Sequence, residues 1–305
     1  MAAFLLKRVL HGFVVLWVVA TLTFILLRLA PGGPFDRERK LPPEVMANIE
    51  AKYHLDEPPL QQYFRYLSGM LRGDLGPSYK YLDRRVNEII ADSLPTSAIL
   101  GGLAVLFALA VSFPAGIASA YYRHSVIDRC CMFFATLGIS VPHFILGASL
   151  IWALALQLGW LQPGRWDEPS SAILPTVTLG AAPAAYLAAL LRSTMIETLT
   201  EDFIRTARAK GVTERAVVLK HALRHSLIPV VTVMGPLTAA LLTGSFVVEY
   251  VFAIPGMGRF FITAVTDRDY PLIMGVTLVY TVVLVCANLL VDLLYGYIDP
   301  RIRTD

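Results

Sequence analysis

The sequence has 305 residues, a formal net charge of +3 and 56% hydrophobic residues, and its mean hydropathy is +0.60. Charged residues make up only 16% of the chain, well below the roughly 25% of ordinary soluble proteins. This composition excludes an ordinary soluble globular protein, and the small net charge gives no indication of nucleic-acid binding.

Six long, nearly uncharged apolar stretches follow one another along the chain. About 20 residues at 1.5 Å each are enough for a helix to cross the hydrocarbon core of a membrane. A soluble protein can bury one or two such helices, but hardly six. We therefore predict an all-α polytopic membrane protein whose single transmembrane domain, 1–305, has spans at about 9–27, 98–121, 131–158, 172–191, 227–248 and 272–291.

The first stretch follows Lys7 and Arg8, as the apolar part of a signal peptide does. It is longer than the 7–15 residues of a typical signal peptide core, and no A-x-A cleavage site follows it. We interpret it as an uncleaved first span.

Basic residues in short loops mark the cytoplasmic side of a membrane protein. The segments 1–8, 122–130, 192–226 and 292–305 are much richer in Lys and Arg than the two short loops on the other side. This asymmetry predicts that both termini and segment 192–226 are cytoplasmic.

Segment 28–95 then faces outward, since long segments translocate largely regardless of their charge. It is the only sizeable polar region, and Pro and Gly divide it into short amphipathic helices. One apolar stripe has Val45, Ile49 and Tyr53; the next is Leu60, Phe64, Leu67 and Leu71. The stripes form either the core of a small extracytoplasmic cap or a docking face for an extracytoplasmic partner.

Motifs of chemical catalysis are absent from the sequence. It has no G-x-x-x-x-G-K-[ST] phosphate loop and no H-E-x-x-H zinc motif. The three cysteines, Cys130, Cys131 and Cys286, lie in or beside the apolar stretches without metal-ligand spacing. An enzyme is therefore a weak interpretation, and no metal or catalytic residue is expected.

A few polar residues in or near the spans are candidates for a translocation path. His143 lies inside the third span beside the helix-bending Pro142, where it either lines a pore or packs. Glu249 lies near a span end, where interfacial solvation also explains it. "PGMG" at 255–258 and "RDYP" at 268–271 form either a re-entrant turn that caps the path, or a gate or contact for a binding protein. The candidates for path or gate are Pro142, His143, Glu249, Arg268 and Asp269.

Segment 192–226 is cationic and rich in alanine, and we expect two helices that meet at Gly211. A glycine there can end the first helix in a left-handed conformation or permit the close approach of another backbone. Small side chains at Ala207 and Ala209 suit a helix that settles into a groove of another protein. Basic amphipathic helices also lie on anionic lipid, but those usually carry large apolar anchors that this stretch lacks.

"RTARAKG" at 205–211 followed by "HALRHSLIP" at 221–229 resembles the cytoplasmic loop of binding-protein-dependent ABC importer permeases of the peptide/nickel type. Ala207 and Gly211 match the third and seventh positions of that family's E-A-A-x-x-x-G motif, whereas Arg205 and Thr206 replace its first two. "RLAPGGP", "GDLGPS", "LPTSAIL", "GISVPHFILG", "LPTVTLG" and the stretch 249–271 extend the similarity over nearly the whole chain. The outer segment is most similar to the B-type subunits of oligopeptide importers.

The resemblance implies six helices of the type I ABC importer kind in a bacterial inner membrane. It implies a second homologous permease, two cytoplasmic ABC ATPases, and an extracytoplasmic binding protein that delivers peptide. The chain would hold no cofactor, since ATP and magnesium belong to the ATPases. The coupling helix would contact an ATPase through the matching positions, Arg205, Ala207, Arg208, Lys210 and Gly211.

Other functions remain open at this stage. The motifs do not separate oligopeptides from dipeptides or nickel complexes as the substrate. A channel or secondary carrier without ATPases, and a signalling or scaffold membrane protein, are the rivals from other classes.

Overall fold

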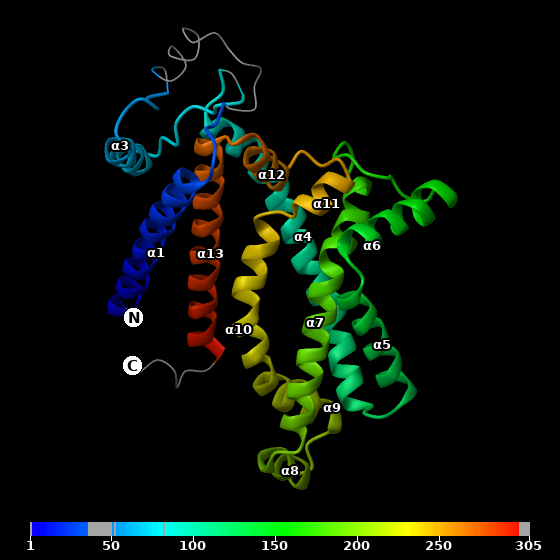
Figure 1. Ribbon diagram of the computed structural model, residues 1–305. Coiled ribbons are helices and arrows are strands. Elements are labelled where there is room, and N and C mark those ends of the chain that lie inside the picture. Colours follow the sequence, from blue (N-terminus) through cyan, green and yellow to red (C-terminus); the bar gives the residue numbers. More distant parts are fainter. Residues whose placement is uncertain (1, 36–50, 52, 82, 299–305) are drawn as a thin grey trace. The chain divides into compact units, whose positions relative to one another are not determined.

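A computed structural model describes residues 2–35, 51, 53–81 and 83–298 of the chain (Figure 1). Within these residues the regular structure is helical, apart from one isolated antiparallel bridge between Pro77 and Arg85. The chain forms two compact units. The terminal unit comprises Ala2–Pro95 and Gly256–Val282, and the central unit comprises Thr96–Pro255 and Val283 onward.

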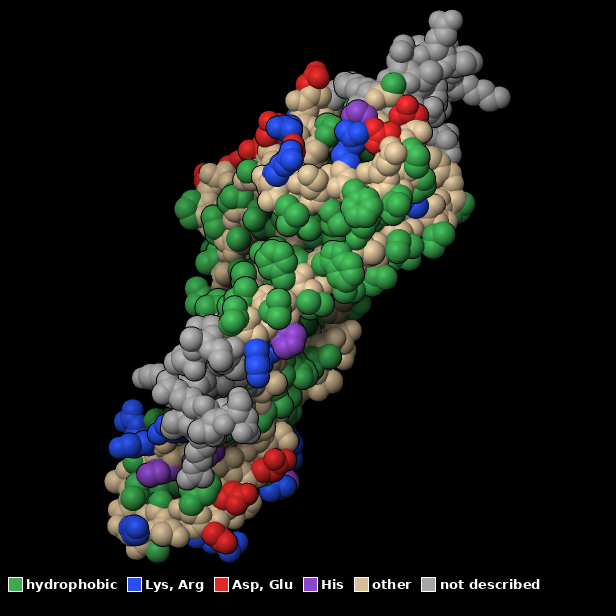
Figure 2. Space-filling view, turned by 90° about the vertical axis from the view of Figure 1, so that its left-hand side faces the viewer, with side chains coloured by type: hydrophobic (Ala, Val, Ile, Leu, Met, Phe, Trp, Pro, Cys, Tyr) green, Lys and Arg blue, Asp and Glu red, His purple; other side chains and the backbone are tan. Residues whose placement is uncertain are grey.

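Five helices among the described residues are long and apolar enough to cross a membrane, or six if a bent pair counts as one span. The first span has large apolar side chains exposed on its surface: Leu10, Phe13 and Trp17 are 64%, 61% and 54% exposed. Hydrophobic side chains cover large areas of the face in Figure 2, and charged ones gather in separate patches. Such a surface suits hydrocarbon rather than water, which agrees with the prediction of an all-α membrane protein.

The terminal unit is built around the ends of long helices. Val86, Ile89, Met257, Leu272 and Val276 are fully buried and form its core. Its elements are α1 (Ala2–Leu29), α3 (Pro59–Leu71), the start of α4 (Val86–Tyr121), α12 (Met257–Asp267) and the start of α13 (Tyr270–Ile298).

The central unit packs α4 and α5 against α7, with α10 on another side of α7 and α8 at one end of α7 (Figure 1). One buried cluster lies beside α8 and another beside α11. The remaining elements are α5 (Val126–Ser140), α6 (His143–Leu150) with its continuation Ile151–Gln157, α7 (Ile173–Leu199), α8 (Asp202–Ala209), α9 (Glu214–Ala216) with Val217–Ala222, α10 (Leu223–Leu242) and α11 (Phe246–Val251).

The expected third span, 131–158, is broken. Helix α5 ends at Ser140, and the chain resumes as Pro142 followed by α6, with a bend of 107° between the two helices. Proline lacks an N–H and disfavours a helical conformation at the residue before it, and Val141 is accordingly extended, with ψ of 119°. The pair is therefore not one straight helix.

The expected fifth span, 227–248, is also interrupted, because it extends past the end of one helix into the next. Helix α10 ends at Leu242, and Gly244 has a left-handed φ of 91° before α11 begins at Phe246. Glycine adopts this conformation without the steric cost that a Cβ imposes. The apolar composition continues through the turn, so hydropathy could not reveal where the helix ends.

Within the described residues, the outer segment contains α3 and the start of α4, and α3 carries the second predicted stripe. The stripe is not the core of a cap, because Leu60, Phe64 and Leu71 are 66%, 59% and 71% exposed. The buried residue of α3 is Gln62. Of the first stripe, Val45 and Ile49 lie outside the described residues.

Close backbone contact between α4 and α10 depends on Gly101. A Cβ at this position would clash with the backbone of Leu241 and Leu242 on α10. The neighbouring Gly102 has open space where its Cβ would be. Small residues at helix contacts in membranes permit this kind of approach.

We predict that Gly101→Ala destabilises the central unit by about 1–3 kcal/mol, because the methyl group forces two backbones apart. Gly102→Ala should be neutral or slightly stabilising, since alanine favours the helix and meets nothing. Thermal unfolding of the two purified variants in detergent checks this. Equal melting temperatures would contradict the close approach.

Candidate functional site

Two apolar side chains pack the inner face of helix α8 against the rest of the chain. Ile204 is fully buried and Ala207 is 7% exposed. Both belong to the cluster that contains Leu191, Met195 and Val217. The inner face of α8 is thus packed against the chain's own α7 and the helical segment before α10, so that the helix has a defined orientation.

The outer face of α8 is cationic and exposed. Arg205 lies 3.4 Å from Asp202, but both side chains are largely in solvent, so this pair contributes little. Arg208 makes a two-point ion pair with Glu214, with N–O distances of 2.7 and 3.1 Å. The Glu214 carboxylate raises the pKa of the Arg208 guanidinium. Arg208 therefore links α8 to α9, while Arg205 and Lys210 remain exposed.

The turn after α8 depends on Gly211. Its N–H bonds to the carbonyl of Arg208, and the N–H of Val212 bonds to the carbonyl of Ala207. This pair of bonds is the Schellman pattern, and it requires a left-handed residue, which Gly211 supplies with a φ of 76°. The prediction of two helices meeting at Gly211 agrees with the structure.

Ala207 differs from its expected role as an outward contact. Its side chain lies in the chain's own core, and we assign it to anchoring α8. The adjacent Phe203 is 39% exposed, and its ring lies 4.8 Å from that of His225. Helical spacing places these residues on one side of α8 but does not tell which of them the core reaches.

Hydroxyl groups that the sequence did not single out tie the two ends of segment 192–226 together. Thr194 on α7 donates to the carbonyl of Ser226 on α10 at 3.1 Å. Ser226 donates to the hydroxyl of Thr198 at 3.0 Å. The helices expected in this segment are therefore fastened to one another at its two ends.

A buried ion pair joins α5 to α7 in the same unit. Arg192 donates twice to Asp128, at 2.7 and 2.8 Å, and the hydroxyl of Ser119 on α4 also donates to this carboxylate. Asp128 is 4% exposed. The two residues are 64 positions apart, and no local signal identifies them as partners.

Pro142 and His143 lie together at the bend between α5 and α6. Pro142 is exposed and precedes the first residue of α6. A ring nitrogen of His143 lies 3.1 Å from the carbonyl oxygen of Thr178 on α7. This contact ties the bend to α7.

Glu249 is fully buried, contrary to the interpretation that it is solvated at an interface. Its carboxylate accepts a hydrogen bond of 2.7 Å from Ser97 on α4. A Cβ on Gly244 would clash with the same carboxylate oxygen. Glu249 therefore connects α4, the turn before α11 and α11 itself.

Arg268 and Asp269 belong to the terminal unit. Arg268 ends α12 with a left-handed φ of 59°, and it donates to the carbonyl of Gly33 at 3.1 Å. Asp269 is fully buried and accepts from the Ser78 hydroxyl and from the backbone N–H groups of Tyr79 and Leu272. Asp269 thus starts α13 and holds the segment around Ser78 in place.

No group of three or more His, Cys, Asp or Glu side chains suited to a metal ion occurs in the part of the chain that the structure describes.

Two family models together match most of the chain. Residues 112–304 match the family described as "Binding-protein-dependent transport system inner membrane component", and residues 1–101 match its N-terminal counterpart. The chain belongs to this family of membrane transport components. Membership makes it an inner membrane component of a binding-protein-dependent transport system.

Curated relatives are similar over nearly their whole length. The oligopeptide transport system permease protein OppB of Haemophilus influenzae is 45% identical, covering 99% of this chain and 100% of the relative. The dipeptide transport system permease protein DppB of Bacillus subtilis is 44% identical, covering 99% and 98%. OppB of Escherichia coli is 43% identical, with 99% and 100% covered.

A solved structure shares the fold. The MetNI methionine ABC transporter, in inward-facing conformations, has a chain that aligns with a TM-score of 0.54 at 20% identity, covering 69% of this chain and 96% of that one. At this identity the likeness shows the type I importer fold and no more.

We predict that Gly211→Ala lowers the free energy of unfolding by about 1 kcal/mol, because a Cβ disfavours the left-handed conformation. No atom lies within 4 Å of where that Cβ would stand, so the effect is conformational. Gly211→Asn should cost less, since asparagine tolerates this conformation better. Thermal unfolding in detergent distinguishes them; equal losses would count against a left-handed cap.

Proposed function

We propose that this chain is a permease subunit of a peptide ABC importer and forms half of its translocation path. Family membership and the names of full-length relatives, which are oligopeptide and dipeptide permeases, support this proposal. A peptide is too polar to cross hydrocarbon, so it needs a path lined by helices at membrane depth. The broken α5–α6 pair suits such a path, because irregular backbone at that depth occurs where it is buried or lines a cavity.

The observation that carries the proposal is the form of α8. It is a short helix whose inner side is anchored by Ile204 and Ala207, while Arg205 and Lys210 stay exposed on its outer side. An anchored helix with a free cationic face can dock in an acidic groove and pass movement to α7 and α10. Segment 192–226 would then be the coupling segment that contacts an ATPase.

The proposed assembly has one second homologous permease, two cytoplasmic ABC ATPases and an extracytoplasmic peptide-binding protein. The ATPases bind ATP and magnesium, hydrolyse the ATP and drive transport, while this chain holds no nucleotide. Both termini and segment 192–226 face the cytoplasm, and segment 28–95 faces outward. The exposed stripe on α3 leaves an outer surface for a partner or for lipid.

Oligopeptides are the substrate we favour, and dipeptides are the alternative, because relatives of nearly equal identity carry each name. Growth of a peptide-auxotrophic strain on peptides of increasing length separates the two. Growth on dipeptides alone would replace the oligopeptide proposal.

We predict that the tagged chain, extracted in mild detergent, co-purifies with a second permease of the same family and with ATPases that carry a phosphate loop. Mass spectrometry of the purified material identifies them. A well-folded chain that purifies alone, or with copies of itself, would instead support a carrier that works without ATPases.

We predict that Arg205→Glu lowers peptide uptake about tenfold or more, because reversing an exposed charge turns an attraction to an acidic groove into repulsion. Arg123→Glu, an exposed reversal outside α8, is the matched control and should transport like the parent. Uptake of labelled peptide and membrane abundance are measured together. Equal uptake by both variants at equal abundance would contradict the docking role of α8.

A further inference from the structure

Helix α3 exposes apolar side chains and buries a polar one, the reverse of an amphipathic helix in a water-soluble domain. Leu60, Phe64 and Leu71 are more than half exposed, Leu67 and Met70 are partly buried, and the buried residue is the polar Gln62. In a water-soluble domain the apolar stripe of an amphipathic helix faces the core. The reversed arrangement indicates that the outer side of α3 meets an apolar medium.

The position of α3 beside α1 identifies that medium. The hydroxyl of Tyr63 on α3 lies 2.7 Å from that of Thr21, and its ring is 5.3 Å from Phe24. Arg28, in the last turn of α1, donates to the side chain of Gln62. Since the span of α1 runs over Leu6–Leu29, α3 lies at the depth of its last two turns. That is the depth at which a bilayer changes from acyl chains to headgroups.

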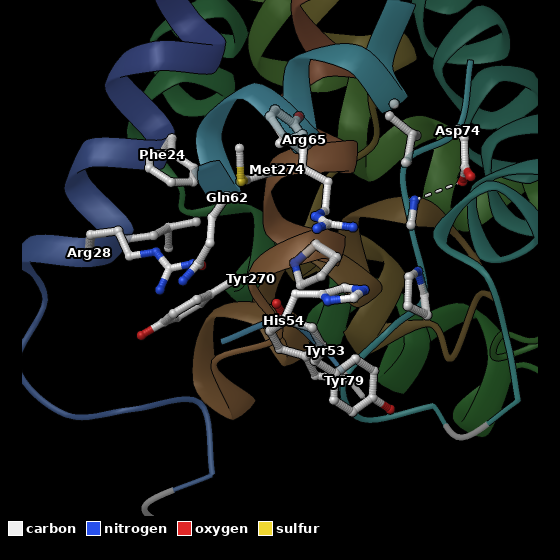
Figure 3. A pocket seen from close by; sticks show the side chains of 17 residues that line it. Phe24, Arg28, Tyr53, His54, Gln62, Arg65, Asp74, Tyr79, Tyr270 and Met274 are labelled. Atoms are coloured by element: carbon white, nitrogen blue, oxygen red, sulfur yellow. Dashed lines mark hydrogen bonds between the residues drawn. The ribbon is translucent and has the colours of Figure 1, made fainter. Parts of the chain in front are cut away.

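A cavity of about 280 Å³ opens in the terminal unit at the same level (Figure 3). Phe24, Leu27 and Met274 line it with apolar surface from α1 and α13, and Arg28, Tyr66 and Tyr270 add polar groups. It therefore offers an apolar wall made by two membrane helices together with a polar wall made in part by α3.

The charge of the cavity is positive because Arg28 has no carboxylate partner among the described residues. Its guanidinium lies over the rings of Phe24 and Tyr270, at 5.3 and 5.9 Å, and bonds to the neutral Gln62. The other charged groups at the cavity are matched. Arg65 pairs with Glu57, and Asp74 pairs with Arg85.

Tyr66 supplies a second hydrogen-bond donor in the cavity wall. The hydroxyl of Tyr66 is buried and has no hydrogen-bond partner within the described part of the chain. Burial raises the pKa of this phenol, so the group stays protonated and can donate. A buried hydroxyl without a partner costs free energy, which a bound acceptor would recover.

We propose that this cavity binds a phosphate-bearing anion, with Arg28 and Tyr66 as donors, and that the anion is the headgroup of a phospholipid. Free phosphate shares the donor requirement, but it would leave the apolar wall of Phe24, Leu27 and Met274 uncovered. The first carbons of an acyl chain fit that wall. The exposed apolar side chains of α3 give lipid a surface to contact beside the cavity. The site lies in the leaflet that contains the C-terminal end of α1. Binding of lipid there does not require the transported substrate.

The test uses the full chain with whatever subunits it retains, purified in mild detergent and titrated with dioleoyl phosphatidylglycerol. Native mass spectrometry counts the bound lipid. Arg28→Gln should weaken binding about tenfold or more, since a hydrogen bond to a charged group is lost. Arg72→Gln removes an exposed charge that is outside the cavity but in the same unit, and it should bind like the parent. Tyr66→Phe should weaken binding about fivefold.

The Tyr66→Phe variant also tests the site without disturbing the fold, because the hydroxyl that it removes has no partner among the described residues. Dioleoylglycerol, which lacks the phosphate, should not bind. The proposal would be overturned if the Arg28→Gln and Tyr66→Phe variants bound the lipid as tightly as the parent does. So would displacement of the lipid by an equal concentration of inorganic phosphate, or of a peptide with a free carboxylate, because either result assigns the donors to a different ligand.

Discussion

Hydrocarbon solvent is the constraint on which this structure depends. No water is available at membrane depth to satisfy backbone N–H and C=O groups, so each long segment must form its own helical hydrogen bonds. Buried polar side chains face the same requirement. Asp128 accepts from Arg192 and Ser119, and Glu249 accepts from Ser97. In both cases a carboxylate joins helices that apolar contact alone would not hold in one register.

Anchoring and exposure are combined in the segment between α7 and α10. The buried Ile204 and Ala207 fix α8 to the bundle, and the hydroxyls of Thr194 and Ser226 fasten the ends of the segment. In the proposed coupling role, these contacts would carry a push on the outer face of α8 to α7 and α10.

Predictions from local pattern succeeded where the cause was local. Gly211 ends α8 because it can be left-handed. Pro142 was recognised as helix-bending, but the predicted span 131–158 did not include the break that it makes. Predictions failed where a distant contact decides. Ala207 has the small side chain of a contact residue, but the core made by α7 and the start of α10 covers it. Leu60 and Phe64 have the spacing of a buried stripe, but they are exposed beside α1.

The sequence by itself determined the class of protein, the approximate spans and the family. Hydropathy, the positions of Pro and Gly, and the residues of a motif are all properties of short stretches of chain. Only the tertiary structure decided that Asp128 pairs with Arg192, that Glu249 is buried rather than solvated, and that Arg28 faces a cavity with Tyr66. The physical reason is that charge pairing and burial depend on atoms brought together across 34 to 235 positions of chain. In hydrocarbon, moreover, a leucine can face outward as favourably as inward.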